Sequence, residues 1–335
     1  MTDKDKKTLE IDRQRDSAFN FELPNSDGIE KLISVDDEMI ILCQNGVFKF
    51  RHADKTDPDR SNPDIVNTTQ CLFPFGKKYT YSQWVFRTAA ALFSDDNGLR
   101  TDINAKGALS KCATIARDFW DIETQLENLI ELEEQALFRE RSIQNNTIHL
   151  PSAPDYRPAV TGFFIKTNHI WRDLLDIMGI CFKHPKWDKG YDGFVEFLSK
   201  THGDDDMFFK LASDSLKQLA MIRNARNALE HPDKSKFILF RDYSLAEDNT
   251  VFLPAIKIVH PHTPHDFVSA SMFMEHLTDR LAFIVEAFLT SACISNAREL
   301  GVFKYFIQGI EGRADQHVLE RYQWICLPVK PLRNS

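Results

Sequence analysis

The sequence predicts a mainly α-helical protein, in which a small α+β N-terminal region precedes a helical bundle with one inserted β-hairpin. Long stretches repeat apolar residues at steps of three and four, which places those residues on one face of a helix. β-Rich runs are short and lie beside turn or loop signals. We therefore divide the chain into an N-terminal region (1–76), a helical region (77–150) and a bundle with its hairpin and C-terminal tail (151–335).

The N-terminal region is predicted to hold a β-hairpin. The β-rich residues 39–43 and 47–50 flank Asn45-Gly46, a dipeptide typical of two-residue hairpin turns. Residues 1–16 are charged and polar, and we expect them to be mobile. The sequence therefore places the first ordered structure of the chain at this hairpin.

The remaining elements are predicted to be helices, with one exception. Two β-rich runs, 236–240 and 251–259, indicate a hairpin between helices. The Asn- and Pro-bearing residues 144–158 are the best candidate for a linker. The tail, 301–335, has apolar clusters, which we expect either to pack on the bundle or to mediate assembly. The predicted helices are 82–93, 104–141, 159–182, 191–199, 206–229 and 267–295.

Composition limits the classes of function. The net charge is −8, whereas a broad nucleic-acid-binding surface is normally basic, so any such binding has to be local. The six cysteines are scattered without a C-x-x-C pair, which is typical of reduced thiols. The N-terminus lacks the apolar segment of a signal peptide, and no apolar run approaches the length of a membrane span. We therefore expect a cytoplasmic protein without membrane contact.

The most informative stretch is Arg226-Asn227-Ala228-Leu229-Glu230-His231, at the end of the predicted helix 206–229. Arg226 falls on the apolar face of that helix, where a leucine would be expected. An unpaired buried charge is strongly destabilising. Arg226 is therefore expected to have a buried partner, to line a cleft or to face another chain.

His231 precedes Pro232, and a proline disfavours helical geometry in the residue before it. The helix is therefore predicted to end near His231, where the helix dipole favours the charged imidazole. An imidazole beside a guanidinium and an amide has the groups needed to hold a phosphodiester and to move a proton at an oxygen atom. This chemistry requires no metal.

The pattern Arg-Asn-x-x-x-His near a helix end resembles the HEPN superfamily (higher eukaryotes and prokaryotes nucleotide-binding). The resemblance implies a HEPN-type helical bundle and a metal-independent endoribonuclease that leaves a 2′,3′-cyclic phosphate. It assigns the catalytic roles to Arg226, Asn227 and His231, with the arginine and the histidine meeting across a homodimer interface. It also implies an RNA substrate, a role as a toxin or defence effector, and an antitoxin or defence-complex partner.

Nearby cations suggest where a substrate phosphate would bind. Arg223, Lys234 and Lys236 give a local positive excess, although lysines in a solvated loop would look the same. Two alternatives to catalysis stay open. Arg226 pairs with a core carboxylate while His231 caps the helix, or the bundle is a non-catalytic dimerisation or nucleotide-binding module within a larger assembly.

Other chemistry has little support in the sequence. His260, His262 and His265 lie within six residues, but two prolines extend this loop and no fixed fourth zinc ligand is visible. We expect the loop to be solvated or to lie near the active cleft. Gly-rich phosphate loops, G-x-S-x-G elbows and H-E-x-x-H motifs are absent from the sequence. We therefore predict neither a metal nor a cofactor.

Overall fold

The computed structural model describes residues 28–35, 38–62, 64–74, 79–94, 98–138, 147, 149–150, 152–153, 156–184, 186–310 and 321–329. The predicted mobile segment 1–16 and seven of the fifteen residues of the predicted linker 144–158 lie outside these residues.

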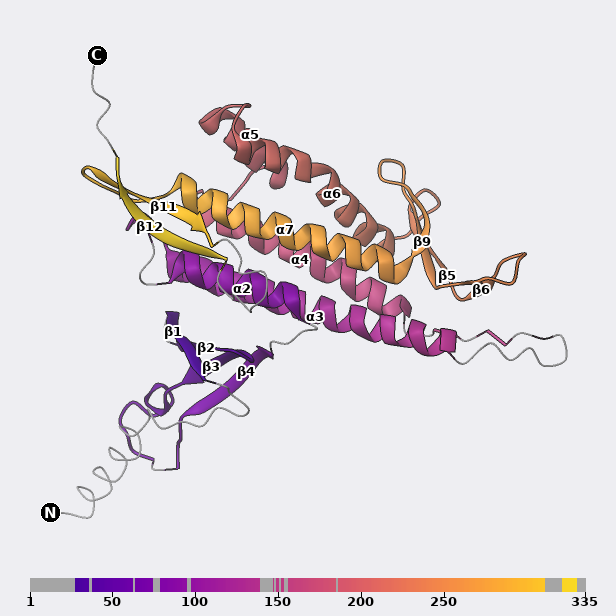
Figure 1. The fold of residues 1–335 in the computed structure, drawn as a ribbon, viewed down its shortest axis with the longest axis horizontal. Coiled ribbons are helices and arrows are strands. Elements are labelled where there is room, and N and C mark those ends of the chain that lie inside the picture. The colour runs from indigo at the N-terminus through magenta and orange to yellow at the C-terminus, as the bar shows by residue number, and fades with distance from the viewer. Residues whose placement is uncertain are drawn as a thin grey trace.

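Long helices form the body of the molecule, with α3 and α4 running side by side along it (Figure 1). Helices α2 and α7 pack against this pair, and α5 packs with α6. None of the helices in the described ranges combines the length and the apolar character needed to cross a bilayer. The described helices are α2 (Thr80–Phe93), α3 (Ala105–Phe138), α4 (Tyr156–Cys181), α5 (Tyr191–His202), α6 (Met207–Glu230) and α7 (Ala270–Ser295).

A four-stranded antiparallel sheet, β1-β2-β3-β4, packs against α2 and α3 through the same hydrophobic core that the helices share. The predicted hairpin is confirmed, because β2 and β3 pair with Cys43 opposite Gly46. A Cβ atom on Gly46 would lie 3.0 Å from the carbonyl oxygen of Phe73, so glycine permits β4 to approach the turn. The strands are β1 (Ile29–Val35), β2 (Glu38–Cys43), β3 (Gly46–Arg51) and β4 (Thr68–Pro74).

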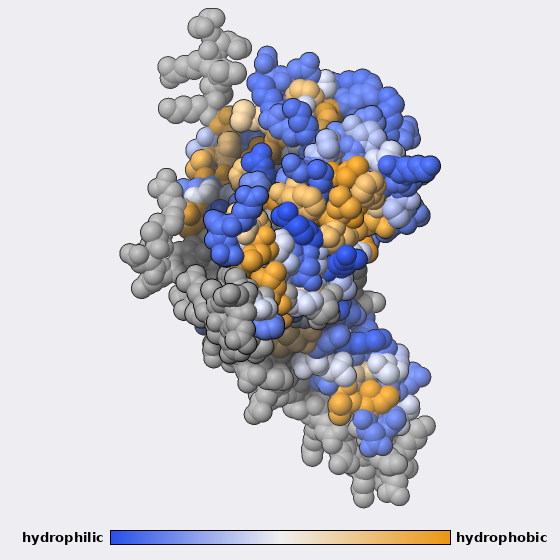
Figure 2. Space-filling view, turned by 90° about the vertical axis from the view of Figure 1, so that its right-hand side faces the viewer, coloured by the Kyte–Doolittle hydropathy of each residue, from blue (hydrophilic) through white to orange (hydrophobic). Residues whose placement is uncertain are grey.

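A second group of strands follows the motif helix, at the end of the molecule where Figure 1 labels β5, β6 and β9. The predicted two-stranded hairpin is instead an antiparallel sheet of order β5-β8-β9, accompanied by the short pair β6-β7. Figure 2 faces this end and shows hydrophobic side chains in patches bordered by hydrophilic ones. The strands are β5 (Phe237–Arg241), β6 (Ser244–Leu245), β7 (Val251–Phe252), β8 (Ala255–Val259) and β9 (His265–Ser269).

The C-terminal tail forms a third sheet at the opposite end of the bundle (Figure 1), from β10 (Glu299–Leu300), β11 (Phe303–Gly309) and β12 (Tyr322–Pro328). The indole N–H of Trp324 donates to the carbonyl of Leu92, which closes this sheet onto α2. A Cβ atom on Gly98 would lie 2.4 Å from the Trp324 ring, so no larger residue fits there. The tail therefore packs on the bundle, one of the two expected outcomes.

The predicted fold class, a mainly α-helical protein with a HEPN-type bundle, is wrong. The structure is about 51% helix and 24% strand, and its strands form four separate small sheets, which makes it a mixed α/β fold. Each predicted helix corresponds to a helix of the structure, although the predicted helix 267–295 began inside β9. The strands β1, β4, β6, β9, β10, β11 and β12 were not identified as strands. Those strands pair with partners that helical periodicity does not reveal.

Buried polar contacts join the helices and the sheets. The Glu123 carboxylate on α3 accepts hydrogen bonds from the backbone N–H groups of Tyr81 and Ser82, at 2.6 and 3.1 Å, and so caps the first turn of α2. Burial raises the pKa of Glu123 to about 7, against the opposing effect of these hydrogen bonds. Glu286 on α7 accepts from Thr88 on α2 and pairs with Arg321 before β12. These contacts fix the bundle that supports α6.

Candidate functional site

The motif lies at the C-terminal end of α6. Asp206 begins this helix as an N-cap, because its carboxylate accepts from the N–H groups of Phe208 and Phe209 at 2.8 and 3.2 Å. Glu230 is the last helical residue, and the N–H of His231 donates to the carbonyl of Asn227 at 2.9 Å. The prediction that the helix ends near His231 is confirmed.

Arg226 occupies the margin of the bundle. Its side chain is 34% exposed and forms a bidentate ion pair with Glu230, with Nε–Oε1 and Nη2–Oε2 distances of 3.0 and 2.9 Å. The expected position within a buried apolar stripe is therefore wrong. The last turns of α6 bury the small residues Ala225 and Ala228, and the long Arg226 side chain reaches past them to solvent. Its partner carboxylate is on the same helix, four residues on, and is itself partly exposed.

His231 is exposed and directly follows the last helical residue, Glu230. Five residues of helix separate the two Cα atoms by about 7.5 Å along the axis and by about 140° around it. Asn227 is only about 40° from His231 on the same scale. One copy of the chain therefore places Asn227 and His231 on one side of the helix and Arg226 on another.

The three predicted phosphate-binding cations separate into two groups. Lys234 and Lys236 lie on the turn that links α6 to β5, directly after His231. Lys236 lies 3.6 Å from Asp233, whose pKa is lowered mainly by the backbone N–H of Ser235. Arg223 instead lines a shallow hollow of about 230 Å³ between α5 and α6. Its Cα atom is about 12 Å from that of His231 along the helix, so it does not join the motif.

The histidine-rich loop contacts the motif helix through Thr263 and Asn224, two residues that the sequence did not single out for a role. Asn224 Nδ2 on α6 donates to Thr263 Oγ1 at 3.2 Å, and Thr263 Oγ1 lies 3.3 Å from His260 Nδ1. Because Nδ1 of His260 also faces the N–H of His262 at 3.2 Å, it is the unprotonated ring nitrogen. Burial lowers the pKa of His260, followed by the charges of His262 and Lys236.

This contact places the loop beside the motif. Asn224 is seven residues before His231, which puts the two within about 20° on one helix face. The seven-residue spacing could have predicted from the sequence that Asn224 shares a helix face with His231. Its hydrogen bond to Thr263 is a tertiary contact, which spacing along the chain does not predict. Among the described residues, no group of three His, Cys, Asp or Glu side chains is arranged to hold a metal ion.

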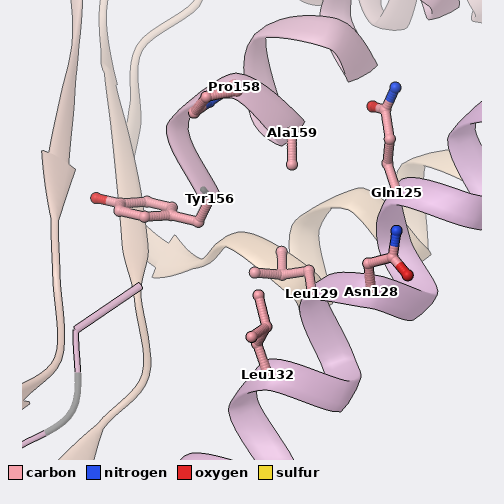
Figure 3. A pocket seen from close by; sticks show the side chains of 7 residues that line it. All are labelled: Gln125, Asn128, Leu129, Leu132, Tyr156, Pro158 and Ala159. Carbon is pink, nitrogen blue, oxygen red and sulfur yellow. The ribbon is translucent and has the colours of Figure 1, made fainter. Parts of the chain in front are cut away.

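A larger pocket lies away from the motif, between α3 and the start of α4 (Figure 3). It has a volume of about 290 Å³ and is lined mainly by carbon, with the amides of Gln125 and Asn128 at one side. Among the described lining residues Tyr156 is the only ionisable one, and its hydroxyl points away from the other labelled side chains (Figure 3). The described lining therefore supplies no general acid or base, and the motif is the better candidate for chemistry.

No family model, curated protein or solved structure matches this chain. The candidate site therefore depends on the residues at the end of α6 and on the segments that contact them.

Proposed function

We propose that the protein is a metal-independent endoribonuclease in which Arg226 and His231 carry the reaction. The observation that carries this proposal is that both motif side chains reach solvent at the end of α6. A purely structural role for Arg226 would require a core carboxylate, whereas its partner is the half-exposed Glu230 on the same helix. Exposed ion pairs of this kind contribute little to stability, so a ligand can displace Glu230 from the arginine at little cost.

The chemistry follows from the two side chains. The Arg226 guanidinium matches the bidentate geometry of a phosphate and would stabilise charge that develops on its oxygens. The 2′-oxygen of RNA attacks the adjacent phosphorus, the bond from phosphorus to the 5′-oxygen breaks, and a 2′,3′-cyclic phosphate and a 5′-hydroxyl result. His231 would transfer a proton, either from the 2′-hydroxyl or to the leaving 5′-oxygen. Asn227, on the same helix face, would orient His231 or the substrate.

The separation of Arg226 and His231 around α6 supports a homodimer as the active form. Two positions about 140° apart around one helix do not place their side chains on the same phosphate within one chain. A second copy related by two-fold symmetry would bring the arginine of one helix beside the histidine of the other. RNA would then displace Glu230 from Arg226. We extend the proposal to a toxin or defence effector that an antitoxin or defence-complex partner restrains, because unrestrained RNA cleavage would harm the cell that makes it.

The Arg226–Glu230 ion pair favours one alternative. If this pair persists, Arg226 is unavailable to a phosphate, and the protein is a non-catalytic dimerisation or nucleotide-binding module within a larger assembly. The two functions differ in whether RNA is cut, since both allow a dimer.

Incubation of the purified protein with single-stranded RNA in excess EDTA tests the proposed function. We expect cleavage to persist, because neither Arg226 nor His231 requires a metal, and we expect the fragments to end in a 2′,3′-cyclic phosphate. Mass spectrometry of the fragments identifies those ends. Cleavage that stops in EDTA would overturn the metal-independent mechanism, and RNA that stays intact with and without metal would favour the non-catalytic module.

A further inference from the structure

The sheet β5-β8-β9 has one face on the bundle and one face toward solvent. Residues alternate between these faces along each strand. Ile256 and Ile258 are buried in the core, and Ile238, Phe240 and Val268 pack against it. The outer face carries the residues between them, including Leu239, which pairs with Lys257 across the strands. This outer face, defined by Leu239, Arg241, Lys257 and Phe267 with Phe252 from β7 beside it, is called the aromatic face below.

Arg241 lies between two phenyl rings of the aromatic face. Its guanidinium carbon is 4.5 Å from the ring centre of Phe267 and 5.4 Å from that of Phe252. These rings are 39% and 45% exposed, which is unusual for phenylalanine. Arg241 forms no ion pair with any residue in the described ranges, and its Nε is buried without a hydrogen-bond partner. The face therefore combines exposed aromatic rings with an uncompensated positive charge.

Lys257 adds a second cation to this face. Its Nζ lies 5.6 Å from the ring centre of Phe267 and 2.9 Å from the carboxylate of Asp266, which is almost fully exposed. A solvent-exposed pair of this kind is weak and exchanges readily with other anions. The aromatic face thus offers two rings, one unpaired guanidinium and one ammonium whose partner is easily replaced.

We propose that the aromatic face binds single-stranded RNA and leads it to the motif. Proteins that bind single strands combine aromatic rings, on which bases stack, with cations along the phosphate backbone. Phe252 and Phe267 supply the rings here, and Arg241 and Lys257 supply the charges. The complementarity is with a chain that carries both flat bases and negative charge, which single-stranded RNA does. The choice of RNA among nucleic acids rests on the proposed ribonuclease function.

The position of the face supports this occupant. Strand β5 begins at Phe237, six residues after His231, and Phe237 pairs with Val259 beside the loop that contacts Asn224. From Phe237 to Arg241 the strand extends about 13 Å away from the motif. Lys234 and Lys236 lie between the two. An RNA strand along β5 would therefore run from the rings past these lysines to His231.

Binding of a fluorescently labelled, unstructured RNA to a His231→Ala protein tests this inference without cleavage. Loss of one stacking ring should weaken binding about tenfold, so Phe252→Ala and Phe267→Ala are each expected to raise Kd by about that factor. Arg241→Gln should raise Kd and flatten its dependence on salt, because one phosphate contact is lost. Fluorescence anisotropy at several salt concentrations gives both quantities.

Phe283 on α7 provides the matched control. It is 55% exposed and also lies beside an arginine, with Arg280 at 5.9 Å from its ring centre, but it is outside the aromatic face. Phe283→Ala should leave Kd unchanged. Equal losses for Phe283→Ala and Phe267→Ala, or an unchanged Kd for Arg241→Gln and both face variants, would overturn the inference, as would the absence of RNA binding by the parent protein. Ring-dependent binding by a protein that cuts no RNA would uphold this inference while the proposed function fails.

Discussion

Replacing His231 by alanine is expected to lower the rate of RNA cleavage by about 10²–10⁴-fold, the usual contribution of a general acid or base. The fold should persist, because the side chain is exposed and lies beyond the last helical residue. The hydrogen bond of His231 to Asn227 uses the backbone N–H, which alanine retains. Single-turnover cleavage in EDTA and the melting temperature measure the two effects.

His262→Ala is the control for this prediction, since it removes another exposed histidine from the loop near the motif. It should leave the cleavage rate within about twofold of the wild-type rate, as surface substitutions outside a site generally have small effects. Cleavage by His231→Ala at the wild-type rate would remove His231 from the mechanism. A large fall in melting temperature would instead assign it to the fold.

Replacing Arg226 by alanine is expected to lower cleavage by about 10²–10³-fold, comparable with the loss of one donor to a developing oxyanion. The free energy of unfolding should change by only about 0.3–0.5 kcal/mol, because the substitution removes one partly exposed ion pair between residues four apart on the same helix. Arg226→Lys should fall between the two proteins in rate, since lysine keeps the charge but not the bidentate geometry. The same cleavage assay and a denaturant titration measure these changes.

Glu230→Gln is the matched control for Arg226. It breaks the same ion pair but keeps the guanidinium, so it should cut RNA at least as fast as the wild-type protein. If Glu230→Gln loses as much activity as Arg226→Ala, cleavage requires the Arg226–Glu230 ion pair and not the guanidinium alone. That result would contradict the assignment of the phosphate contact to Arg226 alone and would give Glu230 a part in the active site.

The helices were predicted well from the sequence because the apolar residues that form the buried face of a helix recur at regular steps within the helix itself. The stop before Pro232 is a local signal, and it holds in the structure. The strands were harder to predict because each strand is stabilised by pairing with another segment, and the sequence of one strand does not identify its partner. Strand β11 pairs with β12 across residues 310–321, and the sequence showed only apolar clusters in this tail.

The candidate site, too, could be predicted only in part from the sequence. The position of the motif at a helix end followed from the sequence, but the burial of Arg226 did not, because it depends on how the end of α6 meets its neighbours. Helical periodicity placed Arg226 in line with Phe208, yet Phe208 is buried and Arg226 is not. The bond between Asn224 and Thr263 and the rings around Arg241 join segments that are distant in sequence. No spacing along the chain predicts such contacts.

A mixed dimer tests the central claim, that Arg226 of one copy acts with His231 of another. Arg226→Ala and His231→Ala chains with different tags are produced together, and the dimers that carry both tags are purified. Each mixed dimer would hold one intact site of two, so we expect about half of the wild-type cleavage rate from two chains that are each inactive alone. A purified mixed dimer that cuts no RNA, or chains that form no mixed dimer, would contradict the claim.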